Sequence, residues 1–311
     1  MSKDMYDVMI LGAGAAGLTA GIYSSRAKLN TLILNEGAVG GQMVLTHEIA
    51  NYPGVENISG YALANIMKKQ ARDFGCAIKS NVKVSRYGFE GNVKEVELED
   101  GRTFKAKTVI VAPGGRPRPL GIPGEDAFKG KGISYCATCD GDFFTGKELV
   151  VVGGGNSALE EAVSLTKYAT KVTIVHQFDH FQAFAHAIKE AKENPKISFV
   201  MESELREVKG NENVESVVIE NLKTGERSEM KTDGVFVFIG YLPNTESLQG
   251  TVPMNERGEI VVDPLMKTSI PGVFAAGDSI TKRFRQVTTA VADGTIAALS
   301  AAEFIRTSEV S

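Results

Sequence analysis

The chain has 311 residues, which is enough for two domains that each enclose a hydrophobic core. Its apolar and charged fractions, 43% and 23%, are those of a globular protein and exclude a largely disordered or collagen-like chain. A formal net charge of -4 argues against nucleic-acid binding, and no apolar run has the roughly 18 residues that a membrane-spanning helix needs. The charged first five residues lead directly into a strand, so we expect no signal peptide.

The first predicted element is an apolar strand at residues 7–11, which leads into the glycine-rich turn GAGAAG at 12–17. A helix is predicted from this turn to about Lys28, and a second strand at 31–34. This order of elements predicts a βαβ unit.

The glycine-rich turn is the first candidate site. In a GxGxxG turn the glycines permit close approach to a pyrophosphate, which the N-terminus of the following helix attracts. Glu36 follows the second strand, where a carboxylate can accept ribose hydroxyls; a solvated surface charge is the alternative. The glycines alone do not distinguish FAD from NAD. The predicted dinucleotide site comprises Gly12, Gly14, Ala15, Ala16, Gly17 and Glu36.

Further along the chain, a proline- and glycine-dense segment at 113–119 marks a domain boundary. A second βαβ pattern follows it, with a strand at 149–152, a glycine-rich turn at 153–158, a helix to about Tyr168 and a strand at 171–175. Such alternation of strands and helices predicts parallel sheets with right-handed crossovers, so the fold class is α/β.

A second break is predicted at 240–244, after a strand at 235–239. The segment 272–278 is expected to be a buried strand that returns to the N-terminal sheet, which makes the first domain discontinuous. We therefore predict two Rossmann-like three-layer domains. Their expected bounds are 1–116 with 245–311 for the first and 117–244 for the second.

Two of the three cysteines, Cys136 and Cys139, form a CxxC pair. Such a pair forms a reversible redox disulfide or supplies half of a zinc site. Neither Cys76 nor the four histidines supply a second ligand pair at zinc-finger spacing, so we expect no metal. A lone CxxC is typical of a reducing compartment, so we expect a cytoplasmic protein in which Cys76 is buried. Asp140 follows the pair and is either a proton donor or a cap for the next turn.

Several motifs together resemble the low-molecular-weight thioredoxin reductase family over essentially the whole chain. They are GGQ at 40–42, NYPG at 51–54, CATCDG at 136–141, and residues 270–278 with the later Arg285 and Gln286. The resemblance implies a homodimeric flavoprotein that holds FAD in the first domain and reduces thioredoxin through the cysteine pair.

The resemblance also implies roles for individual residues. Cys139 would face the flavin, Cys136 would attack thioredoxin, Asp140 would be the acid, and Asp278 would lie at the ribityl chain of FAD. The further cofactor contacts that it implies are Gly41, Gln42, Asn51, Gly277, Arg285, Gln286 and Val287.

The second glycine-rich turn, GxGxxA at 153–158, lacks the charges that usually accompany NADPH binding. NADPH-using relatives end the next strand in an HRRxxxR pattern, whereas this chain reads HQFDHFQ at 176–182, with Gln177, Phe178 and Gln182 at the arginine positions. Three charge-assisted contacts of about 1.5 to 3 kcal/mol each are thereby lost. We interpret this turn as a packing device that binds no nicotinamide nucleotide.

This departure resembles the ferredoxin-dependent flavin thioredoxin reductases, so we expect reduced ferredoxin as the electron donor. An NADPH- or NADH-dependent reductase, the latter using Asp179, and a non-catalytic redox sensor remain the alternatives. Phe178, Phe181 and Phe184 either line a partner surface or pack against a helix. Because ferredoxins are acidic, the expected docking residues are basic: Arg116, Arg118, Lys129, Lys131, Lys282 and Arg283, with scattered surface charge as the alternative for each.

Overall fold

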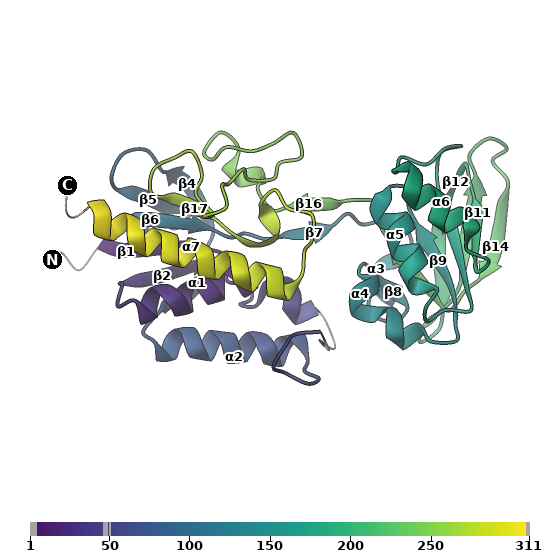
Figure 1. Cartoon of the computed structure of the whole chain (residues 1–311), viewed down its shortest axis with the longest axis horizontal. Coiled ribbons are helices and arrows are strands. Elements are labelled where there is room, and N and C mark those ends of the chain that lie inside the picture. The colour runs from purple at the N-terminus through teal and green to yellow at the C-terminus, as the bar shows by residue number, and fades with distance from the viewer. Residues whose placement is uncertain (1–4, 46–48, 50, 309–311) are drawn as a thin grey trace. The chain divides into compact units, whose positions relative to one another are not determined.

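The structure is a computed structural model that describes residues 5–45, 49 and 51–308 (Figure 1). Residues 1–4, on which the expectation about a signal peptide depends, lie outside these ranges, as does His47. Within the described ranges, no helix combines the length and the apolar composition that crossing a membrane requires.

The chain divides into two compact units. Unit 1 joins Met1–Arg116 to Leu242–Ser311, and unit 2 is Pro117–Tyr241. The second crossing between the units therefore follows Tyr241, whereas we expected it after Asn244. The two crossings pair with each other as a two-stranded sheet. Its strands are β7 (Gly115–Pro117) and β16 (Tyr241–Pro243).

Unit 1 is built on a seven-stranded sheet. Its strands are β1 (Met5–Leu11), β2 (Thr31–Asn35), β3 (Ala77–Ser80), β4 (Val84–Gly88), β5 (Lys94–Leu98), β6 (Thr103–Val111) and β17 (Val273–Ala275). The order is β3-β2-β1-β6-β5-β4, and β17 also pairs with β6. Strands β2, β1, β6 and β17 are parallel, so the return of residues 272–278 to the N-terminal sheet is confirmed.

Helices cover one face of this sheet. They are α1 (Ala15–Arg26), α2 (Gly60–Asp73) and α7 (Val287–Ser308), with the 3₁₀ helices η1 (Gly41–Leu45) and η4 (Gly277–Ser279). The 3₁₀ helix η3 (Glu246–Leu248) packs through Leu248 into the core on the opposite face. Alternate residues of β1, Val8 and Ile10, pack beneath the helices, while those between them join the core on the opposite face. Helix α7 lies against α1 because Gly294 has no side chain: a Cβ there would be 2.2 Å from the carbonyl oxygen of Ala16.

Unit 2 is built on a five-stranded parallel sheet in the order β11-β10-β9-β15-β8. Its strands are β8 (Ile133–Ser134), β9 (Glu148–Val152), β10 (Lys171–Val175), β11 (Ile197–Val200) and β15 (Gly234–Val237). A three-stranded antiparallel sheet packs on one face: β12 (Ser203–Gly210), β13 (Val214–Asn221) and β14 (Arg227–Lys231). Helices α5 (Asn156–Leu165) and α6 (Ala185–Glu193) pack on the other face, and the shorter elements are α3 (Glu125–Phe128), α4 (Ala137–Asp140) and η2 (Gly141–Phe144). The α/β class predicted for the chain is therefore confirmed.

Candidate functional site

The first glycine-rich turn connects β1 to α1 in unit 1. Gly12 has a φ of 109°, and a Cβ at this position would lie 2.1 Å from the carbonyl oxygen of Ala112. Gly17 packs so tightly that a Cβ would lie 1.9 Å from the carbonyl oxygen of Gly12. Gly14 differs, since nothing lies within 4 Å of the position of its missing Cβ. The turn is closed on its sheet side and open at Gly14.

The end of β2 is fastened to this turn by Asn35, a residue that the motif analysis did not single out. Its Oδ1 accepts a hydrogen bond of 2.9 Å from the backbone N–H of Ala13, and its Nδ2 donates to the carbonyl of Gly37 at 2.6 Å. The exposed Glu36 lies between Asn35 and Gly37, which this second bond joins. Asn35 therefore fixes the backbone at Glu36 relative to the glycine-rich turn.

Two segments that are distant in sequence also meet this turn. A Cβ at Gly41 would lie 3.1 Å from the Cα of Gly14, so the residues before Gln42 border the open side. Gly277, at the start of η4, has a φ of 80°, and its missing Cβ would lie 2.9 Å from the Cβ of Ala16. The structure thus brings Gly41 and the Gly277–Asp278 turn to the start of α1.

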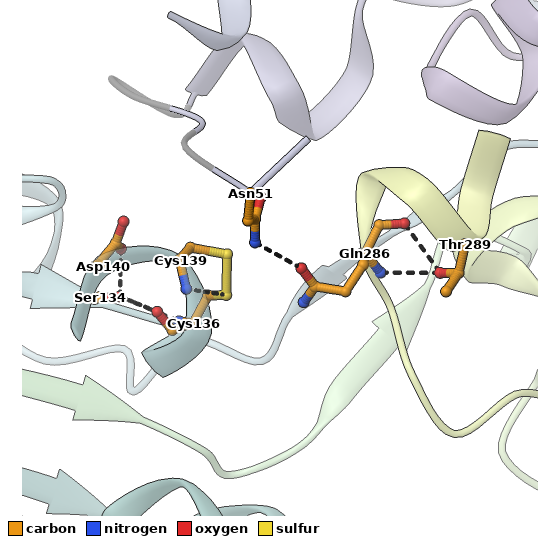
Figure 2. The surroundings of a disulfide bond; sticks show 7 residues. All are labelled: Asn51, Ser134, Cys136, Cys139, Asp140, Gln286 and Thr289. Carbon is orange, nitrogen blue, oxygen red and sulfur yellow. Dashed lines mark hydrogen bonds between the residues drawn. A yellow bond between two sulfur atoms is a disulfide. The ribbon is translucent and has the colours of Figure 1, made fainter. Parts of the chain in front are cut away.

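A further group of predicted residues lies near the start of α7. The Nδ2 of Asn51 donates to Oε1 of Gln286 at 3.2 Å, and the backbone N–H of Gln286 donates to Oγ1 of Thr289 at 3.1 Å (Figure 2). Arg285 directs its Nε to the carbonyl of Asp278 at 3.2 Å, and Val287 is the first residue of α7. Residues 235 positions apart in sequence, Asn51 and Gln286, are therefore in contact.

The cysteine pair lies in unit 2, where Cys136 immediately precedes α4. Cys136 and Cys139 form a disulfide with Cα atoms 5.3 Å apart, and the Sγ of Cys136 accepts the N–H of Cys139 at 3.2 Å. Ser134, at the end of β8, donates its hydroxyl to Oδ2 of Asp140 at 2.5 Å and accepts the N–H of Cys136 at 3.1 Å (Figure 2). Ser134 therefore links the carboxyl of Asp140 to the backbone of Cys136.

A buried carboxylate supports the residue before the pair. Glu125 accepts the N–H groups of Leu120 and Gly121 at 2.8 and 2.7 Å. It also accepts the hydroxyl of Tyr135 at 2.6 Å. Burial, and then the neighbouring Glu125, raise the pKa of Tyr135, so this phenol stays protonated. Tyr135, the residue before the CxxC pair, is consequently held by Glu125, which is not part of the motif.

Cys76 is buried, as expected, and burial raises the pKa of its thiol to about 11. At pH 8 its thiolate fraction is therefore on the order of 10⁻³, and its sulfur is also shielded. After reduction of the native protein, we expect iodoacetamide at pH 8 to alkylate two thiols rapidly and the third only after unfolding, as measured by intact mass. In C76S, the slow thiol should vanish; three rapidly labelled thiols in the native protein would contradict this account.

The second glycine-rich turn connects β9 to α5. The ring of His176, which follows β10, lies directly over it: a Cβ at Gly154 would be 2.4 Å from the ring atoms. The backbone N–H of Gln182 donates to the carbonyl of Gly154 at 2.9 Å, and the N–H of Phe184 donates to Oδ1 of Asn156 at 2.7 Å. The segment after β10 is therefore tied to the turn by its own peptide groups.

The charges at the end of β10 are mainly negative. Asp179 bonds to Nδ1 of His180 at 2.7 Å, and this hydrogen bond lowers the pKa of the carboxyl, which is ionised at neutral pH. Glu202 donates its backbone N–H to the carbonyl of Phe178, and its side chain pairs with Lys223 at 2.6 Å. Two carboxylates thus accompany one ammonium group that is already engaged.

The sequence is compatible with either packing or a partner surface for the phenylalanines of this segment, and the three residues differ in the structure. Phe181 packs against Phe199, whereas Phe178 and Phe184 are 38% and 60% exposed.

The prediction that Lys282 is a docking cation is wrong. This residue forms a 2.5 Å ion pair with Asp293 in which its side chain is only 12% exposed, so it is not offered to a partner.

Within the part of the chain that the structure describes, no group of three or more histidine, cysteine, aspartate or glutamate residues could hold a metal ion. His47, one of the histidines weighed above, lies outside that part.

Known proteins resemble the chain along almost its full length. A family model described as pyridine nucleotide-disulphide oxidoreductase matches residues 6–294. A 34.2 kDa protein in the rubredoxin operon of Clostridium pasteurianum is 47% identical, with 96% of this chain and 97% of that protein covered. Thioredoxin reductase of Peptoclostridium acidaminophilum is 46% identical, with 97% and 98% covered. The crystal structure of thioredoxin reductase from Streptococcus pyogenes superposes with a TM-score of 0.92 at 42% identity, over 98% of this chain and 100% of that one.

Thioredoxin reductases of the matched family bind FAD, and unit 1 fits that cofactor. Helix α1 follows Gly14, which provides no side-chain cap, and has no acidic residue in its first turn, so its N–H groups can receive a pyrophosphate. The open space at Gly14 is compatible with phosphates, and Glu36 is exposed after β2, where a carboxylate can accept ribose hydroxyls.

Proposed function

Because the chain belongs to the low-molecular-weight thioredoxin reductases of the pyridine nucleotide-disulphide oxidoreductase family, we propose that it reduces thioredoxin with electrons from reduced ferredoxin. The electrons pass through FAD to the Cys136–Cys139 disulfide and from there to the thioredoxin disulfide. The observation that carries the choice of donor is the charge at the end of β10 in unit 2, where the arginine positions hold neutral residues and two carboxylates, Asp179 and Glu202, lie close by.

Unit 1 holds the cofactor in this proposal. The first turn of α1 binds the pyrophosphate, Glu36 binds the ribose, and Asp278 binds the ribityl chain. When bound, FAD supplies transfer of two electrons to the cysteine pair. The residues near the flavin ring would be Gln42, Asn51, Arg285, Gln286 and Val287. Gly41 and Gly277, which lie at the start of α1, would be further cofactor contacts.

Unit 2 supplies the dithiol. Reduction of the Cys136–Cys139 disulfide consumes two electrons and gives two thiols once two protons are taken up. Cys139 is the sulfur that exchanges electrons with the flavin. The thiolate of Cys136 then attacks one sulfur of the thioredoxin disulfide and releases the other as a thiolate. Cys139 attacks the mixed disulfide, which frees reduced thioredoxin and restores the Cys136–Cys139 bond.

Asp140 is the proposed proton donor for these thiolates. Its Oδ2 accepts the hydroxyl of Ser134, whose own Oγ is bonded to the N–H of Cys136. This arrangement keeps the carboxyl next to the cysteine segment instead of leaving it to rotate into solvent. A general acid must be within reach of the atom that receives its proton, and Ser134 enforces that condition.

The choice of ferredoxin follows from electrostatics. The 2′-phosphate of NADPH carries about two negative charges and normally requires arginine contacts. At the end of β10 it would instead meet Asp179 and Glu202, while Lys223 is held by Glu202. The nicotinamide nucleotide is disfavoured there by repulsion as well as by the missing arginines. An iron–sulfur donor needs none of these contacts.

The protein is proposed to act as a cytoplasmic homodimer.

Docking of the acidic donor, ferredoxin, is proposed at exposed cations. Arg116 is a weaker candidate because its guanidinium is bound to Asn244 and Glu246. Lys129 is an exposed residue whose ammonium nitrogen lies 5.4 Å from the centroid of the Tyr135 ring. The remaining exposed candidates are Arg118, Lys131 and Arg283.

Thioredoxin reduction by the purified protein tests this function. Reduced ferredoxin is expected to support continuous turnover, while NADPH supports at most about 1% of that rate, given the loss of roughly three charge-assisted contacts to its 2′-phosphate. NADH is expected to be a poor donor as well, because the end of β10 has no carboxylate placed as Glu36 is after β2. The protein without its cysteine pair, C136S/C139S, serves as the control for direct ferredoxin-to-thioredoxin transfer. Turnover with NADPH equal to that with ferredoxin would overturn the choice of donor, and turnover with NADH alone would favour a rearranged nucleotide site at Asp179.

A further inference from the structure

We propose that Glu259 and Asp293, which no sequence motif singled out, are positioning residues for the cofactor. Each holds one end of the turn that contains Gly277 and Asp278, directly or through one intermediary. The inference rests on the proposed contact between Asp278 and FAD, and it is independent of the electron donor.

Asp293 of α7 holds the first end of the turn. Its Oδ2 accepts the backbone N–H of Gly277 at 3.2 Å. The same oxygen pairs with Nζ of Lys282 at 2.5 Å. The side chains of Asp293 and Lys282 are 13% and 12% exposed, so water competes little for these bonds. The carboxylate therefore fixes the Ala276–Gly277 peptide, one residue before Asp278.

Glu259 holds the second end through Arg285. The guanidinium of Arg285 donates from Nε to the carbonyl of Asp278 at 3.2 Å and from Nη2 to Oε1 of Glu259 at 2.5 Å. The other oxygen of Glu259 accepts Nδ2 of Asn255 at 2.7 Å. Glu259 is 11% exposed at its side chain, and Arg285 is 19% exposed. The orientation of the Asp278 peptide consequently depends on a carboxylate from a separate segment.

Both carboxylates are themselves held firmly. The segment after Glu259 is bonded to the segment after the turn, from the N–H of Ile260 to the carbonyl of Ser279 at 2.9 Å and from the N–H of Thr281 to the carbonyl of Ile260 at 3.0 Å. On the other side, Gly294, next to Asp293, brings α7 against Ala16 of α1. Asp293 therefore links the turn, through α7, to α1, the helix whose N-terminus would receive the pyrophosphate.

The physical consequence is preorganisation. Binding of FAD is weakened if the Asp278 carboxylate must first be ordered, since ordering a loop costs free energy at the moment of binding. Two ion pairs that are largely removed from water hold the turn before the cofactor arrives. Removing either carboxylate also removes a counter-charge from Lys282 or Arg285, at sites where water competes little.

The test uses E259Q and D293N, which keep the shape of the side chain and remove its charge. The matched control is D73N, which breaks the ion pair between Lys69 and Asp73 on α2, where both side chains are more than half exposed. Affinity of the apoprotein for FAD is measured by flavin fluorescence. We expect each variant to bind FAD at least about tenfold more weakly than the wild type, and D73N to differ by less than about twofold.

Thermal unfolding with and without saturating FAD separates positioning from general destabilisation. A positioning role predicts that FAD raises the Tm of E259Q and D293N less than that of the wild type, because stabilisation by a ligand follows its affinity. A lower Tm with unchanged FAD affinity in both variants would overturn the proposal. If one variant does not fold, the other decides; if neither folds, E259D and D293E, which keep the charge and displace it, are compared in the same way. Failure of the wild-type apoprotein to bind FAD would instead contradict the cofactor assignment.

Discussion

Thioredoxin turnover is expected to fall by more than about a thousandfold in C139S, the scale of loss when a covalent catalytic residue is removed. Without Cys139 the chain cannot form the disulfide that receives electrons, and it cannot resolve a mixed disulfide on Cys136. Bound FAD should be retained, because the cysteine pair belongs to unit 2 while the glycine-rich turn at α1 belongs to unit 1. Steady-state thioredoxin reduction and the flavin content of the purified variant measure the two effects.

The two cysteines are expected to differ in a second measurement. C139S retains the attacking sulfur and should accumulate a mixed disulfide with oxidised thioredoxin, visible as a covalent complex by intact mass. C136S should form little of it. C76S is the control, since Cys76 is buried away from this chemistry and its replacement should leave turnover unchanged. Undiminished turnover in C139S would refute the catalytic role of the pair and favour a redox sensor.

Arginines at the three exposed positions after β10 are expected to create activity with NADPH. In Q177R/F178R/Q182R we predict that kcat/KM for NADPH rises by about 10- to 100-fold. The gain is smaller than three full charge-assisted contacts would give, because these side chains are exposed and because Asp179 and Glu202 remain nearby. Steady-state rates against NADPH concentration check it.

The gain must depend on location and not on added charge. Three arginines placed at exposed neutral positions elsewhere in unit 2 provide the matched control: Asn211, Asn213 and Ser228. This control should leave kcat/KM for NADPH unchanged, and NADH should gain nothing in either variant because it lacks the 2′-phosphate. Equal gains for NADPH and NADH would show that the arginines do not read that phosphate.

The periodic parts of the fold were predictable from the sequence. Strand β10 was expected at 171–175 and is observed there, because four buried β-branched residues, three of them apolar, follow one another between turns. Helix ends were less predictable. Helix α1 was expected to reach Lys28 but ends at Arg26, since Lys28 adopts a φ of 64°. Helix α5 ends at Leu165 instead of about Tyr168, and just beyond it the ammonium of Lys196, distant in sequence, donates to the carbonyls of Thr166 and Ala169.

The site was predictable only where a motif has fixed spacing. The cysteine pair and the first glycine-rich turn satisfy that condition, so their residues could be named in advance. Asn35, Ser134 and Glu259 act through contacts with residues that no local pattern connects to them, and only the folded chain reveals these contacts. Lys282 illustrates the opposite case. The sequence indicates a cation that a partner can contact, but Asp293, eleven positions along the chain, forms an ion pair with it.

Anaerobic reduction of the bound flavin tests the central claim most directly, because it observes electron entry without thioredoxin. The wild-type protein is mixed with reduced ferredoxin, NADPH or NADH, and the visible flavin absorbance is followed by stopped flow. We predict rapid bleaching with reduced ferredoxin and bleaching at least about 100-fold slower with NADPH, because the contacts to its 2′-phosphate are missing. NADH should also bleach the flavin slowly, because the end of β10 has no carboxylate placed as Glu36 is after β2. Rapid bleaching by NADPH would contradict the account.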